Sequence, residues 1–147
     1  MPGIEGVNLR YGFFYGAETL APTVALLRKR MLPVPRGGGG VHSYVFLPDA
    51  ASATVAALER GVADQAYNVC DDRPTAWNDF FDAVARAYGA PRPLRVPSWV
   101  FGATPYVRDV LRSSIPMSNA KARTRLGWTP TAPAIEDGLA LAVRAGA

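Results

Sequence analysis

Gly-Val-Asn-Leu-Arg-Tyr-Gly-Phe-Phe-Tyr-Gly, residues 6–16, is the stretch around which the rest of the chain can be interpreted. Apolar Val7, Leu9 and Tyr11 alternate with polar residues, which is the period of a β-strand. Glycines then free the backbone on both sides of the aromatic segment 13–15. A loop of this kind at the end of a strand is where an open α/β sheet usually keeps its ligand. Three aromatic side chains after a strand are also typical of a core, and the residues alone leave both interpretations open.

The composition limits the classes of function. A chain of 147 residues with 49% hydrophobic residues suits one domain with a buried core. The net charge is +4, and the densest basic run, 28–30, indicates a solvated helix end rather than a nucleic-acid patch. Cys70 is the single cysteine, which excludes an internal disulfide and predicts a reducing, cytoplasmic location. We expect neither a nucleic acid nor a membrane as partner, because uncharged stretches such as 96–107 are too short to span a bilayer.

Strand-like and helix-like segments alternate along the chain. Apolar residues spaced three or four apart predict helices, and short apolar runs bounded by Pro, Gly or Asp predict strands. The expected strands are 7–11, 41–47, 66–70 and 94–96, and the expected helices are 19–31, 50–60, 77–88, an interrupted 99–112, 118–126 and one from 135 onward.

The run Arg-Gly-Gly-Gly-Gly, residues 36–40, suggests a phosphate-binding loop by composition only. Such a loop needs a strand before it, a helix directly after it and usually a lysine or an ordered glycine spacing. Prolines precede this run, and the strand-like segment 41–47 follows it. The sequence therefore predicts a mobile surface hairpin.

No constellation of residues for catalysis is present, and we assign no catalytic residue. His42 is the only histidine, and an isolated histidine is more often structural or solvated than an acid or base. None of the 6 tyrosines has a lysine four places on, so the cation that lowers the pKa of a catalytic tyrosine is missing. Asp71 and Asp72 have no third ligand at suitable spacing, and we expect no metal site.

Four segments, taken in order, resemble motifs of the extended short-chain dehydrogenase/reductases, the NAD-dependent epimerase/dehydratase family. Residues 9–16 resemble its strand and loop L-R-Y-x-x-x-Y-G, and residues 45–51 resemble V-H-V-x-D-x-A. Residues 57–69 are similar to A-L-E-x-G followed by Y-N-V, and residues 118–130 to S-N-x-K-A-x-x-x-L-G-W-x-P. The resemblance extends over residues 4–140 and matches only the second half of that family. The first half would carry the glycine fingerprint for the dinucleotide and the catalytic Tyr-x-x-x-Lys.

The resemblance implies an α/β fold: the C-terminal part of a Rossmann-like epimerase/dehydratase, with few parallel strands and a mostly helical substrate-binding lobe. Residues 1–147 would form a single partial domain, with the strand 9–11 parallel to 66–70. NAD or NADP would be the cofactor, although its full site would not be present in this chain. The residues implied to contact the cofactor are Tyr11, Gly12, Phe13 and Phe14, and those implied to contact the substrate are Tyr15, Arg36, His42, Ser43, Tyr44 and Arg112.

Two departures from the family pattern bear on the substrate. Enzymes acting on sugar nucleotides often place arginine where His42 stands, to grip a diphosphate with forked hydrogen bonds, and asparagine where Phe13 stands. Both changes leave room for a smaller or more apolar substrate.

The expected function is the substrate-binding half of an NAD(P)-dependent epimerase, dehydratase or reductase, inactive alone, acting on a sugar nucleotide or a related small hydroxy or keto compound. The alternative is a non-catalytic interaction module that docks a partner chain. Its site would be the strand 9–11, expected to be an exposed parallel edge open to association.

Overall fold

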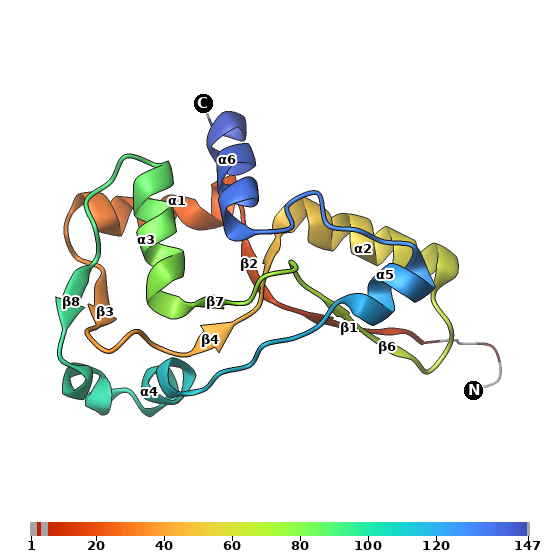
Figure 1. The fold of residues 1–147 in the computed structure, drawn as a ribbon, viewed down its shortest axis with the longest axis horizontal. Coiled ribbons are helices and arrows are strands. Elements are labelled where there is room, and N and C mark those ends of the chain that lie inside the picture. The colour runs from red at the N-terminus through yellow and green to blue at the C-terminus, as the bar shows by residue number, and fades with distance from the viewer. Residues whose placement is uncertain (1–2, 4–5, 147) are drawn as a thin grey trace.

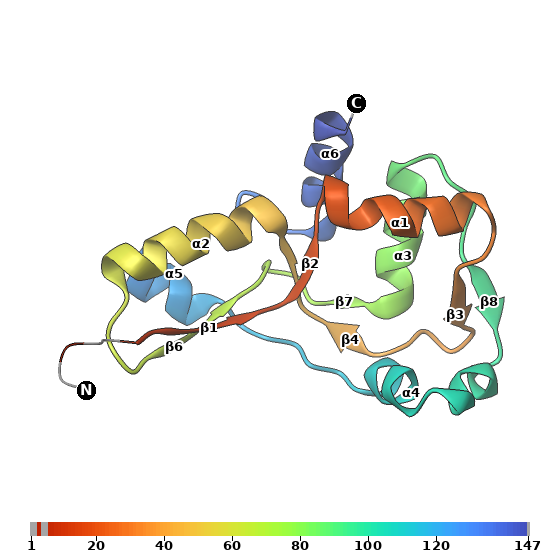
Figure 2. The same ribbon diagram turned by 180° about the vertical axis from the view of Figure 1, so that it is seen from behind.

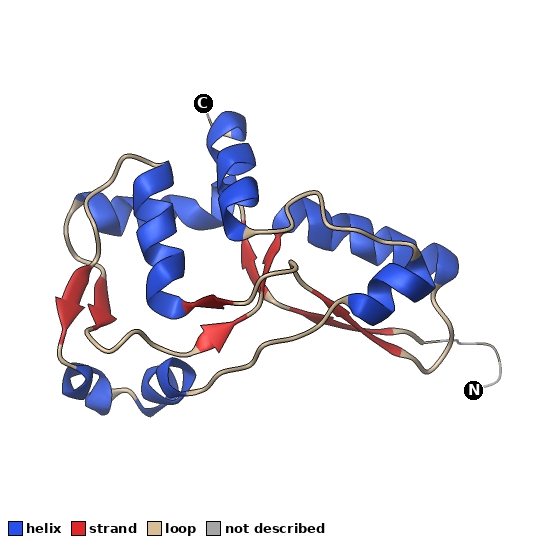
Figure 3. Ribbon diagram, in the orientation of Figure 1, coloured by secondary structure: helices blue, strands red, loops and turns tan. Residues whose placement is uncertain are grey.

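The structure is a computed structural model that describes residue 3 and residues 6–146 (Figure 1). Short strands cross the middle of the molecule, and helices lie around them (Figure 3). One end holds a two-stranded sheet covered by two helices, and the other end is a mostly helical lobe (Figure 1). This arrangement confirms the predicted fold class.

The N-terminal extended segment forms two consecutive strands that belong to two different sheets. β1 (Asn8–Tyr11) pairs in parallel with β6 (Ala66–Val69), as predicted. The chain then passes Gly12 and continues as β2 (Phe13–Tyr15), which pairs in parallel with β5 (Tyr44–Phe46). Figure 2 shows β1 and β2 as one nearly continuous path leading into the first helix.

Glycine is required between the two strands because the backbones meet there. A side chain at Gly12 would place its Cβ 2.7 Å from the carbonyl oxygen of Ser43. The Phe13 amide donates to that same oxygen at 2.9 Å, so the first strand leaves its partner in one sheet and takes a new one within a single residue.

Two helices cover one face of the β1–β6 sheet. α2 (Leu47–Arg60) presents a stripe of buried alanines, and α5 (Ala120–Leu126) packs beside it. Tyr67 and Val69 on β6 are buried beneath them, whereas the alternate residues of the strand are partly exposed. The strand period of two therefore separates a packed face from a wetter one.

A buried carboxylate ties α2 to the segment that leads into the last helix. Both carboxylate oxygens of Asp49 accept hydrogen bonds: Oδ1 from the Thr131 amide at 2.9 Å and the Thr131 hydroxyl at 2.6 Å, and Oδ2 from the Ala132 amide at 2.9 Å. The side chain sits in the first turn of α2, where the helix dipole also favours a negative charge.

The helical lobe is built on aromatic packing. α1 (Ala17–Arg28), α3 (Trp77–Ala87) and α6 (Ile135–Ala145) surround it. The Tyr44 and Phe80 rings stack with their centroids 4.2 Å apart.

Two further small strand pairs complete the sheet structure. β3 (Pro33–Pro35) pairs in parallel with β8 (Leu94–Val96), and β4 (Val41–His42) pairs antiparallel with β7 (Thr75–Ala76). The β3–β8 pair lies at the outer end of the lobe and the β4–β7 pair near the middle of the molecule (Figure 1). The predicted hairpin at residues 36–40 is therefore wrong, since the strands on either side of the glycines pair with other segments.

Backbone hydrogen bonds fix the position of the glycine run, residues 36–40. The Gly40 amide donates to the Leu111 carbonyl at 2.8 Å, and the Trp77 amide donates to the Gly40 carbonyl at 3.0 Å. The run thus connects the start of α3 with the end of α4 (Pro105–Arg112), which follows the 3-10 helix η1 (Ser98–Ala103). Among the described residues, no helix is both long and apolar enough to cross a bilayer.

Candidate functional site

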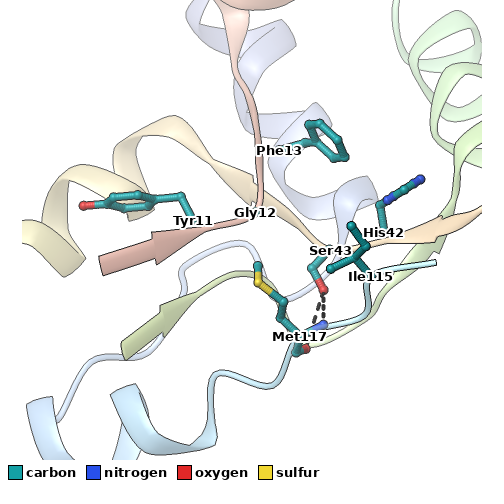
Figure 4. A pocket seen from close by; sticks show the side chains of 7 residues that line it. All are labelled: Tyr11, Gly12, Phe13, His42, Ser43, Ile115 and Met117. Carbon is teal, nitrogen blue, oxygen red and sulfur yellow. Dashed lines mark hydrogen bonds between the residues drawn. The ribbon is translucent and has the colours of Figure 1, made fainter. Parts of the chain in front are cut away.

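A pocket of about 170 Å³ opens where β1 passes into β2 (Figure 4). Three segments that lie far apart in the sequence meet there: the β1–β2 junction, the junction of β4 and β5, and the irregular segment between α4 and α5. The lining residues are Tyr11, Gly12, Phe13, His42, Ser43, Ile115 and Met117.

Aromatic rings arranged edge to face form one wall. The centroid of the Phe13 ring lies 5.3 Å from that of the His42 ring, at an interplanar angle of 81°. It lies 6.0 Å from the centroid of the Trp77 ring, at an angle of 79°. His42 and Trp77 meet each other in the same way at 5.9 Å. Because the positive ring edge meets the negative ring face, such contacts hold the rings in defined positions. Phe13 stays 42% exposed, so part of its ring is available to a ligand.

The opposite wall is fastened by Ser43 (Figure 4). Its Oγ accepts a hydrogen bond from the Met117 amide at 2.8 Å and donates to the Met117 carbonyl at 3.5 Å. The Ile115 amide donates to the Val41 carbonyl at 2.8 Å. The Ser43 hydroxyl therefore positions the wall and has both its donor and one acceptor site engaged by the backbone.

His42 is buried and uncharged. Its side chain is 1% exposed, and among the described residues neither ring nitrogen has a hydrogen-bond partner. Burial lowers the pKa of His42 below its ordinary value of 6.5. The imidazole is therefore neutral at pH 7 and contributes a flat ring without charge to the wall.

Tyr11 forms the outer rim of the pocket with its ring turned away from the other labelled side chains (Figure 4). Its hydroxyl shares a 2.6 Å hydrogen bond with Thr54 on α2. Phe14 packs on the Tyr11 ring with a centroid distance of 5.2 Å and does not line the pocket. The predicted cofactor residues Tyr11, Gly12 and Phe13 are thus together, with Phe14 beside them.

The predicted substrate residues are divided among three places. His42 and Ser43 line the pocket, whereas Tyr15 and Tyr44 are buried in the core of the helical lobe. Burial is the largest cause that raises the pKa of both tyrosine hydroxyls, so both stay protonated throughout the neutral range.

The two predicted arginines lie outside the pocket. Arg36 donates from Nε to the Arg95 carbonyl at 3.4 Å. Arg112 lines a separate cavity of about 270 Å³ together with Arg108, beside the glycine run. The structure therefore does not bring these cations to the β1–β2 junction.

Ile115 and Met117 are the lining residues that the sequence did not indicate. They lie in a segment without helical or strand periodicity, and their place is set by hydrogen bonds to Val41 and Ser43. No local pattern could have found them, because their partners are more than 70 residues away in the chain.

The two aspartates after β6 differ in their surroundings. Asp72 accepts hydrogen bonds from Asn119 Nδ2 at 2.8 Å and from Arg123 at 2.7 Å. Burial alone would raise the pKa of Asp72, but these bonds outweigh it and lower the pKa. Asp71 is 2% exposed with neither carboxylate oxygen bonded within the described part of the chain, and burial raises its pKa to about 7. The described residues include no group of three side chains suited to holding a metal ion.

The residues of the pocket fit only part of a dinucleotide. The lining carries no lysine or arginine, and its walls are mostly apolar side chains. A flat ring suits such a surface, whereas a pyrophosphate requires cations or converging backbone amides. The pocket therefore suits a single flat, uncharged ring and not a pyrophosphate.

Known proteins resemble this chain, although no family model matches it. It is 35% identical over 148 residues to the 3-diazoavenalumate denitrifying reductase of a Streptomyces species, a match that covers 92% of this chain and 46% of that protein. Thermus thermophilus UDP-glucose 4-epimerase, solved in complex with NAD, is 30% identical in sequence to this chain. The two structures align with a TM-score of 0.69 over 97% of this chain and 46% of the epimerase.

A human epimerase family protein, isoform 2, solved with NADPH, has the same fold at 17% identity. Its TM-score is 0.82, and the match covers 98% of this chain and 50% of that one. The chain thus spans about half the length of the proteins it matches. The order of its motifs, its parallel strand pairs and these likenesses lead to one assignment: the chain belongs to the extended short-chain dehydrogenase/reductases, the NAD(P)-dependent epimerase/dehydratase family, and corresponds to their C-terminal half.

Proposed function

We propose that this chain is the substrate-binding half of an NAD(P)-dependent epimerase, dehydratase or reductase, and that it is inactive by itself. The observation that supports this most directly is the position of the pocket. It lies at the carboxyl end of β1, beside the parallel partner β6, which is where open α/β sheets bind their ligands. The sequence lacks both the glycine fingerprint and the Tyr-x-x-x-Lys pair, so the proton-transfer group would come from elsewhere.

The residues of the pocket divide into two roles in this proposal. Tyr11 and Gly12 would face the nicotinamide end of the dinucleotide, which would supply hydride transfer, and Phe13 would stand between it and the substrate side. His42 and Ser43 form the substrate side, with Ser43 holding the wall and His42 contributing an uncharged ring. Arg112 and Arg108 line a separate cavity and have no role in this pocket.

A chimera tests the proposal. The N-terminal half of the Streptomyces reductase is fused to this chain and given two assays: NADPH oxidation with 3-diazoavenalumate, and conversion of UDP-glucose to its 4-epimer in the presence of NAD. We expect turnover in one of these assays by the chimera and in neither by the 147-residue chain alone. Turnover by the chain alone would contradict the proposal, as would a folded chimera that binds NADPH but is inactive with both substrates.

The free edge of β1 favours a second candidate function, an interaction module. The Asn8 amide donates to the Gln65 carbonyl and the Gly12 amide to the Val69 carbonyl, both on the β6 side. Because strand amides alternate in direction, those of Leu9 and Tyr11 point to the other edge, which pairs with no strand in the described residues. An unpaired edge of this kind accepts a further strand.

The partner we propose for this edge is a separate chain that carries the N-terminal half of an extended short-chain dehydrogenase/reductase. Sedimentation of this chain with the isolated N-terminal half of the Streptomyces reductase measures the association. Leu9→Pro removes an outward-pointing amide and is expected to abolish the complex, whereas Leu9→Ala trims the same side chain and keeps the amide. Equal binding by both variants would contradict docking through this edge.

A further inference from the structure

We propose that the pocket between Phe13, His42 and Ile115 binds a single aromatic ring of an uncharged substrate, so that this protein acts on a small aromatic compound rather than on a nucleotide sugar. The inference rests on the proposed function, because it takes the β1–β2 junction to be the substrate side of the site. It adds the chemical class of the substrate, which the family assignment leaves open.

The size of the pocket matches one ring. Its volume is about 170 Å³, and its exposed lining is mostly apolar. An apolar cavity of about 150 Å³ accommodates benzene, whereas sites for larger organic ligands span roughly 300–1,000 Å³. This open pocket therefore has room for one six-membered ring.

The wall recognises a ring by its shape and quadrupole. Phe13 is held edge-on against His42 and Trp77, which fixes its orientation and leaves its outer part exposed. A ligand ring entering beside Phe13 continues the same edge-to-face pattern, which is worth about 0.5–1.5 kcal/mol per ring pair beyond burial. Ile115, 59% exposed on the opposite side, supplies an aliphatic surface for the ring face.

The same wall disfavours a diphosphate. The lining includes no cation, and the Ser43 hydroxyl is engaged by Met117. His42 is neutral because its burial lowers the pKa, so it does not replace the missing positive charge. A doubly charged diphosphate brought here would lose water without gaining the charged hydrogen bonds that normally hold it.

The experiment compares two ketones of the same outline on the ¹⁵N-labelled chain. Acetophenone carries the aromatic ring, and cyclohexyl methyl ketone is its saturated match. Amide shifts of Gly12, Phe13 and Ser43 report occupancy of the pocket. We expect saturable shifts with acetophenone and at least threefold weaker binding of the saturated ketone. UDP-glucose at the same concentrations should leave these amides unshifted.

Phe13→Leu tests the mechanism of recognition. It keeps an apolar side chain but removes the ring, so we expect acetophenone to bind about three- to tenfold more weakly while the saturated ketone changes little. Phe14→Leu is the matched control, because Phe14 packs on Tyr11 outside the pocket. Circular dichroism confirms that each variant is folded.

Three outcomes would overturn the inference: equal affinity for the two ketones, no saturable shift with acetophenone, or UDP-glucose shifting the pocket amides where acetophenone does not. These outcomes are separate from failure of the proposed function. A chimera that epimerises UDP-glucose in the presence of NAD would support the family activity and remove only the aromatic substrate class.

Discussion

Replacing Asp71 by asparagine should stabilise the folded chain at pH 8 and change little at pH 4. The carboxylate is buried without a hydrogen-bond partner among the described residues, and the asparagine amide has nearly the same shape without the charge. Burial is the largest cause that raises the pKa of Asp71 from 3.8 to about 7, and the charges of Asp72 and Glu136 add to it; the polar backbone near Arg73 and Tyr44 lowers it in part without forming a hydrogen bond of good geometry.

The sign follows from the protons that each state binds. Between pH 3.8 and about 7, Asp71 is protonated in the folded chain and ionised in the unfolded chain. The unfolded state binds fewer protons there, so the free energy of unfolding falls as pH rises. Each pH unit is worth about 1.4 kcal/mol, so the three units of this window amount to about 4 kcal/mol at pH 8. Asparagine at position 71 has no charge, so the free energy of unfolding of the variant does not fall in this way between pH 4 and pH 8.

Urea unfolding followed by the fluorescence of the 3 tryptophans measures the difference between Asp71→Asn and the parent at several pH values. Groups that titrate alike in both proteins cancel in that difference. We expect the gap to widen steadily from pH 4 to pH 7 and then level off. Asp72→Asn is the control, and we expect it to destabilise the folded chain at pH 8. Hydrogen bonds from Asn119 and Arg123 lower the pKa of Asp72, so its charge is stabilising. A pH-independent gap, or an Asp71→Asn protein less stable at pH 8, would refute the reasoning.

Two further substitutions test the packing that positions the site. Asp49→Ala leaves the buried amide of Ala132 and the partly buried amide of Thr131 without an acceptor and should lower the free energy of unfolding by about 2–4 kcal/mol in urea, with Asp49→Asn losing less. Equal stability of Asp49→Ala and the parent would contradict this. Gly138→Ala places a methyl group 2.6 Å from ring carbons of Tyr15 and should cost about 1–3 kcal/mol. Tyr15→Leu in the same chain should recover part of that loss, and a Gly138→Ala protein of unchanged melting temperature would argue against the close approach.

The elements that the sequence predicted well are those with many residues in one period. The apolar stripe of α3 extends over 11 residues, enough for its burial to determine the helix. β1 is shorter, but its alternation places Leu9 and Tyr11 on the more covered face. The parallel pairing of β1 with β6 followed from the family resemblance and is confirmed by the register, with Leu9 opposite Tyr67.

The short pairs β3–β8 and β4–β7 could not be predicted, because two or three residues carry no period and their partners are chosen by the surrounding lobe. The same reason explains the error at the glycine run. The path of the glycine run is set by hydrogen bonds with Leu111 and Trp77. The positions of proline and glycine in the sequence do not indicate these distant partners.

The candidate site was predicted in part. Tyr11, Gly12, Phe13, His42 and Ser43 are brought together, whereas Arg36, Tyr15, Tyr44 and Arg112 lie elsewhere. The family motifs give the order of segments along the chain, but the direction of each side chain depends on tertiary contacts. The burial of the Asp71 side chain is likewise a result of tertiary packing, which no local sequence pattern indicates.

Amide hydrogen exchange along β1 tests the central claim most directly: that this chain presents one paired and one open edge where the rest of a dinucleotide-binding sheet would join. The Gly12 amide donates to Val69, and Arg10 points the same way by alternation, so both should exchange slowly. The Leu9 and Tyr11 amides should exchange at nearly the rate of an unstructured chain. Strong protection of all four amides in the monomeric chain would show that the outer edge is already paired and would contradict the account.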